Sequence, residues 1–246
     1  MGTSIVITSG KGGTGKTTCA GAIGHALASL GKKVLLIDCD IGLANLDIIL
    51  GLTDKALWDF SDILSGTAGA ERAVIAHPSI ENLYFLPAPS VASAQDIAAS
   101  DFSRLVSSLC EEYDFVILDS PAGVGTGFEL ACRAADMAVI VTTSDSTSLR
   151  DGQRVCVLLH EFGIENVRLI VNRVDPKMMK KIRRNVDDII DSVGAQLIGI
   201  VSEDESIPLA ANNEKPLLLF GAKYAYAQFY RIARRLTGED VPLGKF

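Results

Sequence analysis

The chain has 246 residues, 48% of them hydrophobic, and 30 acidic residues against 23 lysines and arginines give it a net charge of −7. Its length suits one large domain, and no shift in composition predicts a second, so we expect a single domain over residues 1–246. The acidic balance argues against a dedicated nucleic-acid binder, no signal peptide precedes the first expected strand, and no apolar run approaches the roughly twenty residues that span a bilayer.

The cysteines support a cytosolic location. There are five, an odd number, and none of them occurs in C-x-x-C spacing. Most lie among apolar residues, which predicts buried, reduced thiols and argues against a metal or iron–sulfur site.

The first predicted strand, Ser4–Thr8, leads into a glycine-rich loop. This loop matches the pattern G-x-x-x-x-G-K-[ST] from Gly10 to Thr17. Apolar residues then recur at helical spacing until Gly31, where we expect the helix to end. A strand, this loop and a helix in that order predict a phosphate-binding loop, and an ordinary glycine-rich turn is the alternative.

The composition of the loop suits nucleotide phosphates. Glycines let the backbone turn tightly, so that successive N–H groups and the positive end of the following helix point into one cavity. Lys16 would reach the β- and γ-phosphates, and the Thr17 hydroxyl would ligate Mg²⁺. Lys11 has no role in this pattern. The predicted phosphate-binding residues are Gly12, Gly13, Thr14, Gly15, Lys16, Thr17 and Thr18.

Further short, β-branched apolar runs alternate with helical patterns along the chain. The alternation, without antiparallel hairpin signals, predicts an α/β fold with a mostly parallel sheet and helices on both faces. A last helix, at about Ala222 to Leu236, has one apolar stripe and packs on the surface. The runs are Val34–Asp38, Leu83–Pro87, Phe115–Asp119, Ala138–Thr142, Leu169–Asn172 and Leu197–Val201.

Two of the predicted strands end in carboxylates at the same end of the sheet as the loop. Asp38 and Asp40 follow one strand, and Asp119 ends another before a Pro-Ala-Gly turn. Ligands of such sheets bind at the carboxyl ends of the strands. We expect Asp119 to hold the Mg²⁺ shell and Asp40 to be catalytic, whereas Asp38 is ambiguous. The alternative for each is a carboxylate that caps a turn or helix.

One segment departs from the acidic balance of the chain. Residues Arg173–Arg184 read RVDPKMMKKIRR and are densely basic. Charge-rich helices are mostly solvated faces, which is the expected interpretation, and a contact with nucleic acid or lipid is the alternative.

Five of these stretches together carry a resemblance to a known family. They are KGGTGKTT, IDCDIGLANLD, NLYFLPA, DSPAG and EDES, in that order along the chain. The sequence resembles the MinD/ParA family of deviant Walker A ATPases, and within it the MinD members most. The match runs to about Gly238, which is nearly the whole chain.

The resemblance implies a single-domain P-loop NTPase that binds ATP and Mg²⁺ and hydrolyses ATP. It implies a homodimer in the ATP-bound state, which acts as a positional switch in septum placement. Lys11 would be the signature lysine that reaches the nucleotide of the other subunit, Asp40 would orient the attacking water, and Asn172 would contact adenine. Residues 203–208 would close over the base. Asp151 matches a surface position that meets the partner proteins MinC and MinE.

Two features depart from the family pattern. Thr14 stands where the family usually has valine. Only four residues follow Pro242, too few for the amphipathic helix with which the family's MinD members attach to membranes. Direct membrane binding is therefore not expected, and the protein would be cytoplasmic or held at the inner face of the membrane by a partner.

Other functions of the same family remain open at this point. A ParA-type ATPase would bind DNA as an ATP dimer, a possibility that Arg173–Arg184 favours and the net charge opposes. A flagellar-number regulator would have the same catalytic residues. A nucleotide-gated scaffold with negligible turnover would differ only in its lack of hydrolysis.

Overall fold

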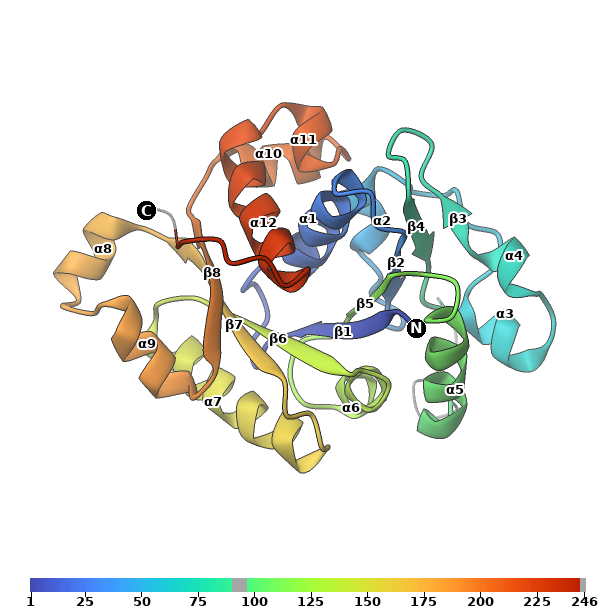
Figure 1. Cartoon of the computed structure of the whole chain (residues 1–246), viewed down its shortest axis with the longest axis horizontal. Coiled ribbons are helices and arrows are strands. Elements are labelled where there is room, and N and C mark those ends of the chain that lie inside the picture. The colour runs from blue at the N-terminus through green and yellow to red at the C-terminus, as the bar shows by residue number, and fades with distance from the viewer. Residues whose placement is uncertain (90–96, 244–246) are drawn as a thin grey trace.

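The computed structural model describes residues 1–89 and 97–243, and within them the strands form one sheet (Figure 1). Its strands are β1 (Thr3–Thr8), β2 (Val34–Asp38), β3 (Ile75–Ala76), β4 (Leu83–Leu86), β5 (Phe115–Asp119), β6 (Met137–Thr142), β7 (Val167–Val174) and β8 (Gln196–Ser202). Their order across the sheet is β3-β4-β2-β5-β1-β6-β7-β8. The mostly parallel α/β fold is confirmed.

One edge of the sheet differs from the prediction. The seven expected runs all form strands, and they pair in parallel. The additional strand β3 pairs antiparallel with β4 and places Ile75 opposite Phe85. This strand was not predicted, because two residues are too short to show a strand period.

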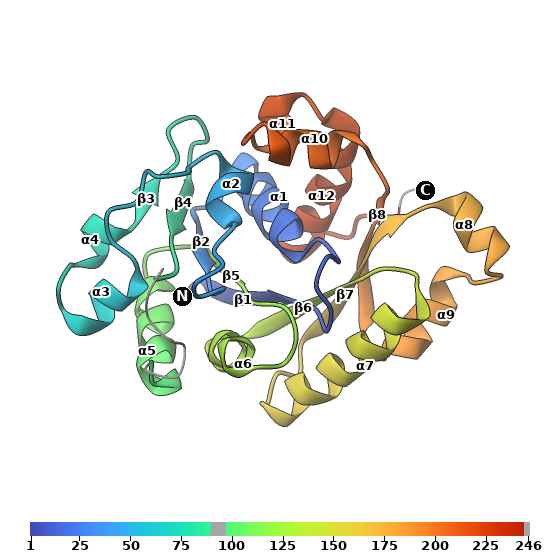
Figure 2. The same ribbon diagram turned by 180° about the vertical axis from the view of Figure 1, so that it is seen from behind.

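Helices cover both faces of the sheet, as Figures 1 and 2 show from opposite sides. One layer contains α1 (Lys16–Ser29), α2 (Leu46–Leu50), α10 (Ser206–Asn212), α11 (Leu217–Phe220) and α12 (Lys223–Leu236). The other contains α3 (Phe60–Ser65), α4 (Ala70–Ala73), α5 (Ala99–Leu109), α6 (Thr126–Arg133), α7 (Ser146–Glu161), α8 (Pro176–Lys181) and α9 (Val186–Val193). Two apolar cores therefore lie on either side of one sheet.

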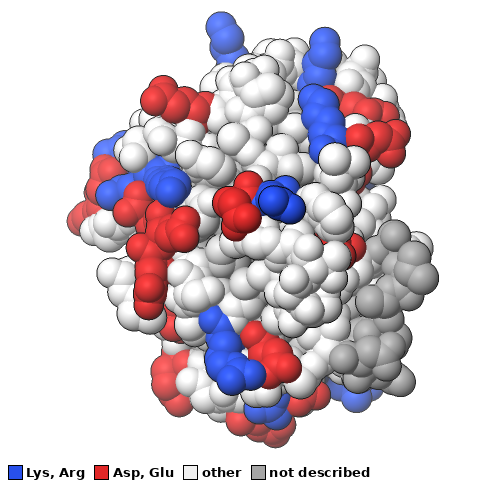
Figure 3. All heavy atoms as spheres, turned by 90° about the vertical axis from the view of Figure 1, so that its right-hand side faces the viewer, with Lys and Arg blue, Asp and Glu red and all other residues white. Residues whose placement is uncertain are grey.

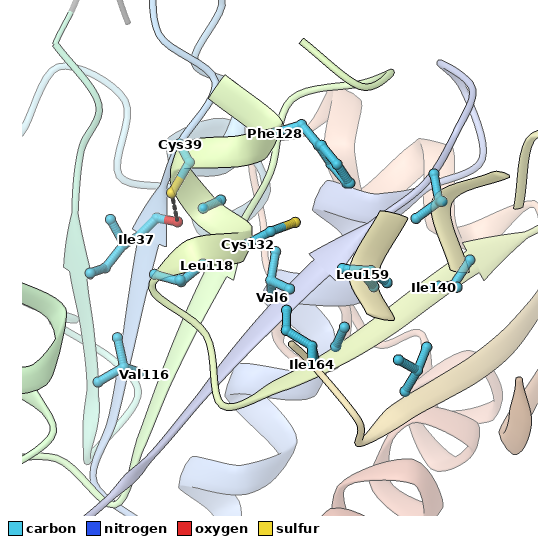
Figure 4. Packing of buried hydrophobic residues seen from close by; sticks show 14 of the residues in the cluster. Val6, Ile37, Cys39, Val116, Leu118, Phe128, Cys132, Ile140, Leu159 and Ile164 are labelled. Atoms are coloured by element: carbon cyan, nitrogen blue, oxygen red, sulfur yellow. Dashed lines mark hydrogen bonds between the residues drawn. The ribbon is translucent and has the colours of Figure 1, made fainter. Parts of the chain in front are cut away.

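The cores explain why the central strands are apolar throughout instead of alternating. All residues of β2, β5 and β6 are buried, since helices cover both of their faces. On one face, Val6 and Leu118 belong to the same cluster as Phe128 and Cys132 of α6 and Leu159 of α7 (Figure 4). A truncation such as Phe128→Ala would cost about 3–5 kcal/mol of stability.

The predictions for the cysteines and for the last helix are confirmed by the structure. All five cysteines are buried free thiols. Helix α12 buries Ala225, Phe229 and Ile232, as the apolar stripe predicts. Residues 244–246, on which the expected lack of a C-terminal amphipathic helix depends, lie outside the described residues. Across the described ranges, no helix combines the length and apolarity that crossing a membrane requires.

The basic segment lies at the periphery of the molecule. Helix α8 exposes Lys177, Lys180 and Lys181 and lies away from the middle of the sheet (Figures 1 and 2). On the side of the molecule that carries β3 and α4, basic and acidic side chains are interspersed (Figure 3). The exposure of α8 agrees with a solvated face.

Candidate functional site

The glycine-rich loop joins the end of β1 to the start of α1, as predicted. Gly13 and Gly15 have φ of 81° and 90°, a region that only glycine adopts without strain. A Cβ on Gly15 would also collide with the side-chain amide of Asn172. Helix α1 begins directly after the loop, and the backbone N–H groups at its N-terminus favour anions. Lys16, its first residue, is 8% exposed.

Asn172 connects the carboxyl end of β7 to this loop. Its Nδ2 donates to the carbonyl oxygen of Thr14 at 2.7 Å. The amide Oδ1 of Asn172 and the hydroxyl of Thr14 are both buried without a hydrogen-bond partner within the described structure. Unpaired buried polar atoms are costly, so the Asn172 amide oxygen is a candidate ligand acceptor.

A pocket of about 260 Å³ opens beside the loop. Gly15 of the loop, Thr18 of α1 and Asn172 of β7 line it. Glu203, Asp204, Ile207 and Pro208 line it as well. The segment that the resemblance places over a nucleotide base thus lines the same pocket as the glycine-rich loop.

Two buried carboxylates end neighbouring strands under the loop. Asp38 of β2 and Asp119 of β5 are register partners, exposed by 0% and 2%. Burial is the main cause that raises the pKa of both carboxylates. For Asp119, the charge of Asp38 raises the pKa further. A hydrogen bond from Thr17 opposes the shift in the pKa of Asp119.

The two carboxylates differ in their partners. Asp38 accepts the backbone N–H of Asp40 at 2.8 Å and those of Asn45 and Leu46 at 3.1 Å, so it holds the loop that leads into α2. Asp119 Oδ1 has no hydrogen-bond partner in the described structure. The ambiguous Asp38 therefore has a structural role, and Asp119 is the carboxylate with a free oxygen.

Asp40 lies beyond the end of β2 and is only partly buried. Burial raises its pKa, and the charge of Lys16 opposes that shift. The structure thus brings Asp40 and Asp119 to the same side of the sheet as Lys16, which is the arrangement that the strand ends predict.

Lys11 lies apart from these groups. Its side chain is 48% exposed, and its Nζ is 3.1 Å from the Thr147 hydroxyl and 3.6 Å from Asp145 Oδ1. Burial would raise the pKa of Asp145, but hydrogen bonds from Thr143, Thr147 and Ser148 and the charge of Lys11 outweigh it and lower that pKa. The two loop lysines therefore occupy different environments.

Asp151 lies on α7 against the start of the loop. A Cβ on Gly10 would come within 2.5 Å of the Asp151 carbonyl oxygen, so glycine is required for this close approach. Asp151 also lines an open hollow of about 440 Å³ with the exposed side chains of Arg154, Val124 and Val157. This mixed apolar and charged surface adjoins the loop, because Asp151 of α7 packs against Gly10.

Several residues around the site were not predicted from the sequence. Asp145 and Thr147, the contacts of Lys11, follow the carboxyl end of β6 in a run of polar residues, and their place at a strand end was the available signal. Arg173 was assigned only to the basic segment, although it directly follows Asn172 and lines the pocket.

The oxygen atoms of Asp119 and Thr17 suit a hard divalent cation. The buried Asp119 oxygen without a partner and the neighbouring Thr17 hydroxyl are oxygen ligands of the kind that Mg²⁺ takes. Within residues 1–89 and 97–243, no group of three or more His, Cys, Asp or Glu side chains forms a metal cluster.

Comparisons with known proteins extend over nearly the whole chain. Residues 5–217 match the family model of the CobQ/CobB/MinD/ParA nucleotide binding domain. The septum site-determining protein MinD of Thermotoga maritima is 41% identical, over 99% of this chain and 91% of its own. A chain of the MinC:MinD cell division protein complex of Aquifex aeolicus superposes with a TM-score of 0.91, 40% identity and 99% coverage of both chains. MinD complexed with Mg-ADP from Pyrococcus horikoshii superposes with a TM-score of 0.85, 28% identity and 96% coverage of both.

Proposed function

The chain belongs to the CobQ/CobB/MinD/ParA family of nucleotide-binding proteins, and from that membership we propose that it is a MinD-type ATPase of cell division. The protein would bind ATP with Mg²⁺, form a homodimer in that state, and act as a positional switch for septum placement that hydrolysis resets. Relatives named MinD, similar over almost the full length, support the cell-division role.

The contrast between the two loop lysines is the observation that carries the dimer proposal. Lys16 is buried at the start of α1, whereas Lys11 is half exposed at the rim of the loop. A cation at the rim can reach a phosphate on another molecule and stabilise the charge of a transferred phosphoryl group, as an arginine finger does. Hydrolysis would then depend on dimerisation.

The nucleotide would lie along the loop and into the pocket beside it. Gly12, Gly13, Thr14, Gly15, Lys16, Thr17 and Thr18 would hold the phosphates. Asn172 would accept a hydrogen bond from the adenine amino group, because its own Nδ2 is already bonded to Thr14. Residues 203–208 would cover the base, since four of them line the pocket.

Thr17 and Asp119 would hold the Mg²⁺ ion. Bound Mg²⁺ neutralises charge on the phosphates. Among the described residues, Asp119 Oδ1 has no hydrogen-bond partner, and a cation would stabilise the ionised form that burial disfavours. Asp40, partly exposed and near Lys16, would accept a hydrogen bond from the attacking water and orient it.

A regulatory partner would dock on the surface around Asp151. The Aquifex aeolicus relative is in a complex with MinC, which supports a partner of that type for this chain. Exposed Val124 and Val157 offer apolar area, and Asp151 and Arg154 offer charge. Because α7 contacts Gly10, docking there would act close to the phosphate loop.

We place the protein in the cytoplasm, where its substrate ATP and a reducing milieu for its five free thiols are found. A partner would hold it at the inner face of the cell membrane.

A second candidate function, DNA binding by the ATP dimer, is favoured by the exposed lysines of α8. DNA binding that requires ATP and weakens steeply with salt would support it. If no such binding is found, the DNA-binding function is refuted and the MinD-type function is the one that remains.

The Asp40→Ala variant tests the proposed function. It should bind ATP normally and not hydrolyse it, so a dimer should accumulate on gel filtration with ATP and Mg²⁺ and not with ADP. A variant that stays monomeric with ATP, or hydrolyses at the wild-type rate, would refute the proposal for Asp40. The accumulated dimer is also the form with which to capture a partner.

A further inference from the structure

An ion pair closes the side of the nucleotide pocket. Arg173 donates from Nε to Glu203 Oε2 at 3.0 Å and from Nη2 to Glu203 Oε1 at 3.2 Å. This two-pronged geometry is the strongest that an arginine and a carboxylate can adopt. Both side chains are about half exposed, at 54% and 47%, so solvent and salt reach the pair.

The backbone is irregular at Arg173, where its side chain meets Glu203. Val171 pairs with Ile200 and Val174 with Ser202, so β7 contains one more residue than β8 at this point. This bulge leaves Arg173 with φ of 55°, a left-handed conformation that is unfavourable for a residue with a side chain. Strained backbone of this kind is concentrated at functional sites.

The pair also reaches the phosphate loop. Arg173 Nη1 lies 3.4 Å from the carbonyl oxygen of Gly13. Gly13, Arg173 and Glu203 line both the base-side pocket and a second hollow of about 320 Å³ in front of Lys11. The pair is therefore the wall shared by the two hollows, and it connects the end of β7, the segment after β8 and the loop.

We propose that Arg173 and Glu203 form a clasp that retains bound nucleotide and sets the rate of its release. This inference rests on the proposed nucleotide site and goes beyond it, because it concerns the ion pair between Arg173 and Glu203 and the rate of nucleotide release. Residues of the segment 203–208 and of the loop line the same pocket, and Arg173 contacts both Glu203 and Gly13, so a nucleotide leaves faster when this link is broken. Arg173 acts as a positioning residue and needs no contact with the reacting atoms.

Release of a fluorescent N-methylanthraniloyl-ADP with Mg²⁺ measures the clasp directly. Arg173→Ala and Glu203→Gln should each release it about three- to fivefold faster, the upper part of the range expected for an exposed ion pair with two-pronged geometry, with association rates unchanged. The double variant should release it no faster than either single variant, because both changes break one interaction. In the wild type, release should accelerate with salt, and the variants should show a weaker dependence, because the contacts of Lys16 with the phosphates remain.

Two controls separate retention from folding. Arg234→Ala breaks a comparably exposed pair between Arg234 of α12 and Glu239, which follows that helix, outside the pocket, and should leave release unchanged. Arg173→Gly removes the clasp while relieving the left-handed backbone, so its apo form should melt at or above the temperature of Arg173→Ala, yet release nucleotide as fast.

The possible results are distinguishable. If the wild type binds the nucleotide and the Arg173 and Glu203 variants release it at the wild-type rate, the clasp is refuted and the nucleotide site stands. If the wild type binds no nucleotide, the proposed function itself fails and the clasp fails with it.

Discussion

Asn172 and Thr14 are joined by a hydrogen bond of 2.7 Å from the Asn172 Nδ2 to the Thr14 carbonyl oxygen. This bond fixes the orientation of the amide, so its Oδ1 is the group left to accept from a ligand. An acceptor at this position favours the amino group of adenine and opposes the carbonyl oxygen that guanine carries at the same place.

We therefore expect Asn172→Ala to reduce selectivity between ATP and GTP. Affinity for ATP should fall about tenfold, the effect of one hydrogen bond of about 1.4 kcal/mol, while affinity for GTP falls less. Competition binding with both nucleotides measures the ratio. Equal losses for ATP and GTP would mean that Asn172 supports only the loop.

Lys16→Ala should abolish ATP binding. The substitution removes the principal cation from a cradle of neutral backbone amides, and Lys16 is the lysine that is buried in the loop. Isothermal calorimetry with ATP and Mg²⁺ should show no binding heat. Lys11→Ala is the matched control and should retain ATP binding; wild-type affinity in Lys16→Ala would contradict the phosphate-loop assignment.

Thr14→Val should stabilise the nucleotide-free protein. The Thr14 hydroxyl is buried without a hydrogen-bond partner in the described structure, and an isosteric methyl group removes its desolvation cost. The free energy of unfolding in urea should rise by about 1 kcal/mol. ATP affinity should stay the same, and a weaker affinity would identify the hydroxyl as a nucleotide ligand.

Buried His25 should make the protein sensitive to acid. It packs on Tyr226 with ring centroids 5.1 Å apart, and burial first, then the charge of His77, lowers its pKa from 6.5 to about 4. Unfolded chains bind the proton at higher pH, so this contribution to stability is present above pH 6.5 and is lost as pH falls toward 4.

The variant His25→Leu isolates that contribution from other titrating groups. Between neutral pH and pH 4 the wild type should lose about 2–3 kcal/mol more stability than His25→Leu, measured by denaturant titration at each pH. Parallel pH profiles would show that His25 is not held neutral in the folded protein.

The sequence predicted the fold well because helices on both faces leave the strands as continuous apolar runs. Val34–Asp38 and Phe115–Asp119 have this pattern, and their carboxyl ends located Asp38 and Asp119 near the loop. Position along a strand did not show what each carboxylate contacts. The structure shows that Asp38 accepts from backbone N–H groups of the next loop, while Asp119 Oδ1 has no hydrogen-bond partner in the part of the chain that is described.

Side-chain contacts between segments that are distant along the chain could not be predicted from the sequence. Nothing in the pattern around Lys11 indicates Thr147, 136 residues away, because a side-chain contact leaves no periodicity. The bulge that brings Arg173 to Glu203 is likewise a property of two paired strands and not of either alone. Buried, periodic features were thus predictable, and long-range polar contacts were not.

The central claim, that Lys11 acts on the nucleotide of a second copy, is tested most directly by mixing two inactive variants. Each site of the proposed dimer needs Asp40 from its own subunit and Lys11 from the other. A dimer of one Lys11→Ala subunit and one Asp40→Ala subunit then has one complete site and one site that lacks both groups.

ATP hydrolysis by an equal mixture is the measurement, with mixed dimers verified by native mass spectrometry. Each variant alone should be nearly inactive, and random pairing predicts recovery of roughly a quarter of the wild-type rate, since half the dimers are mixed and half their sites are complete. If mixed dimers form and the rate stays at the level of the separate variants, Lys11 serves its own subunit and the claim is wrong.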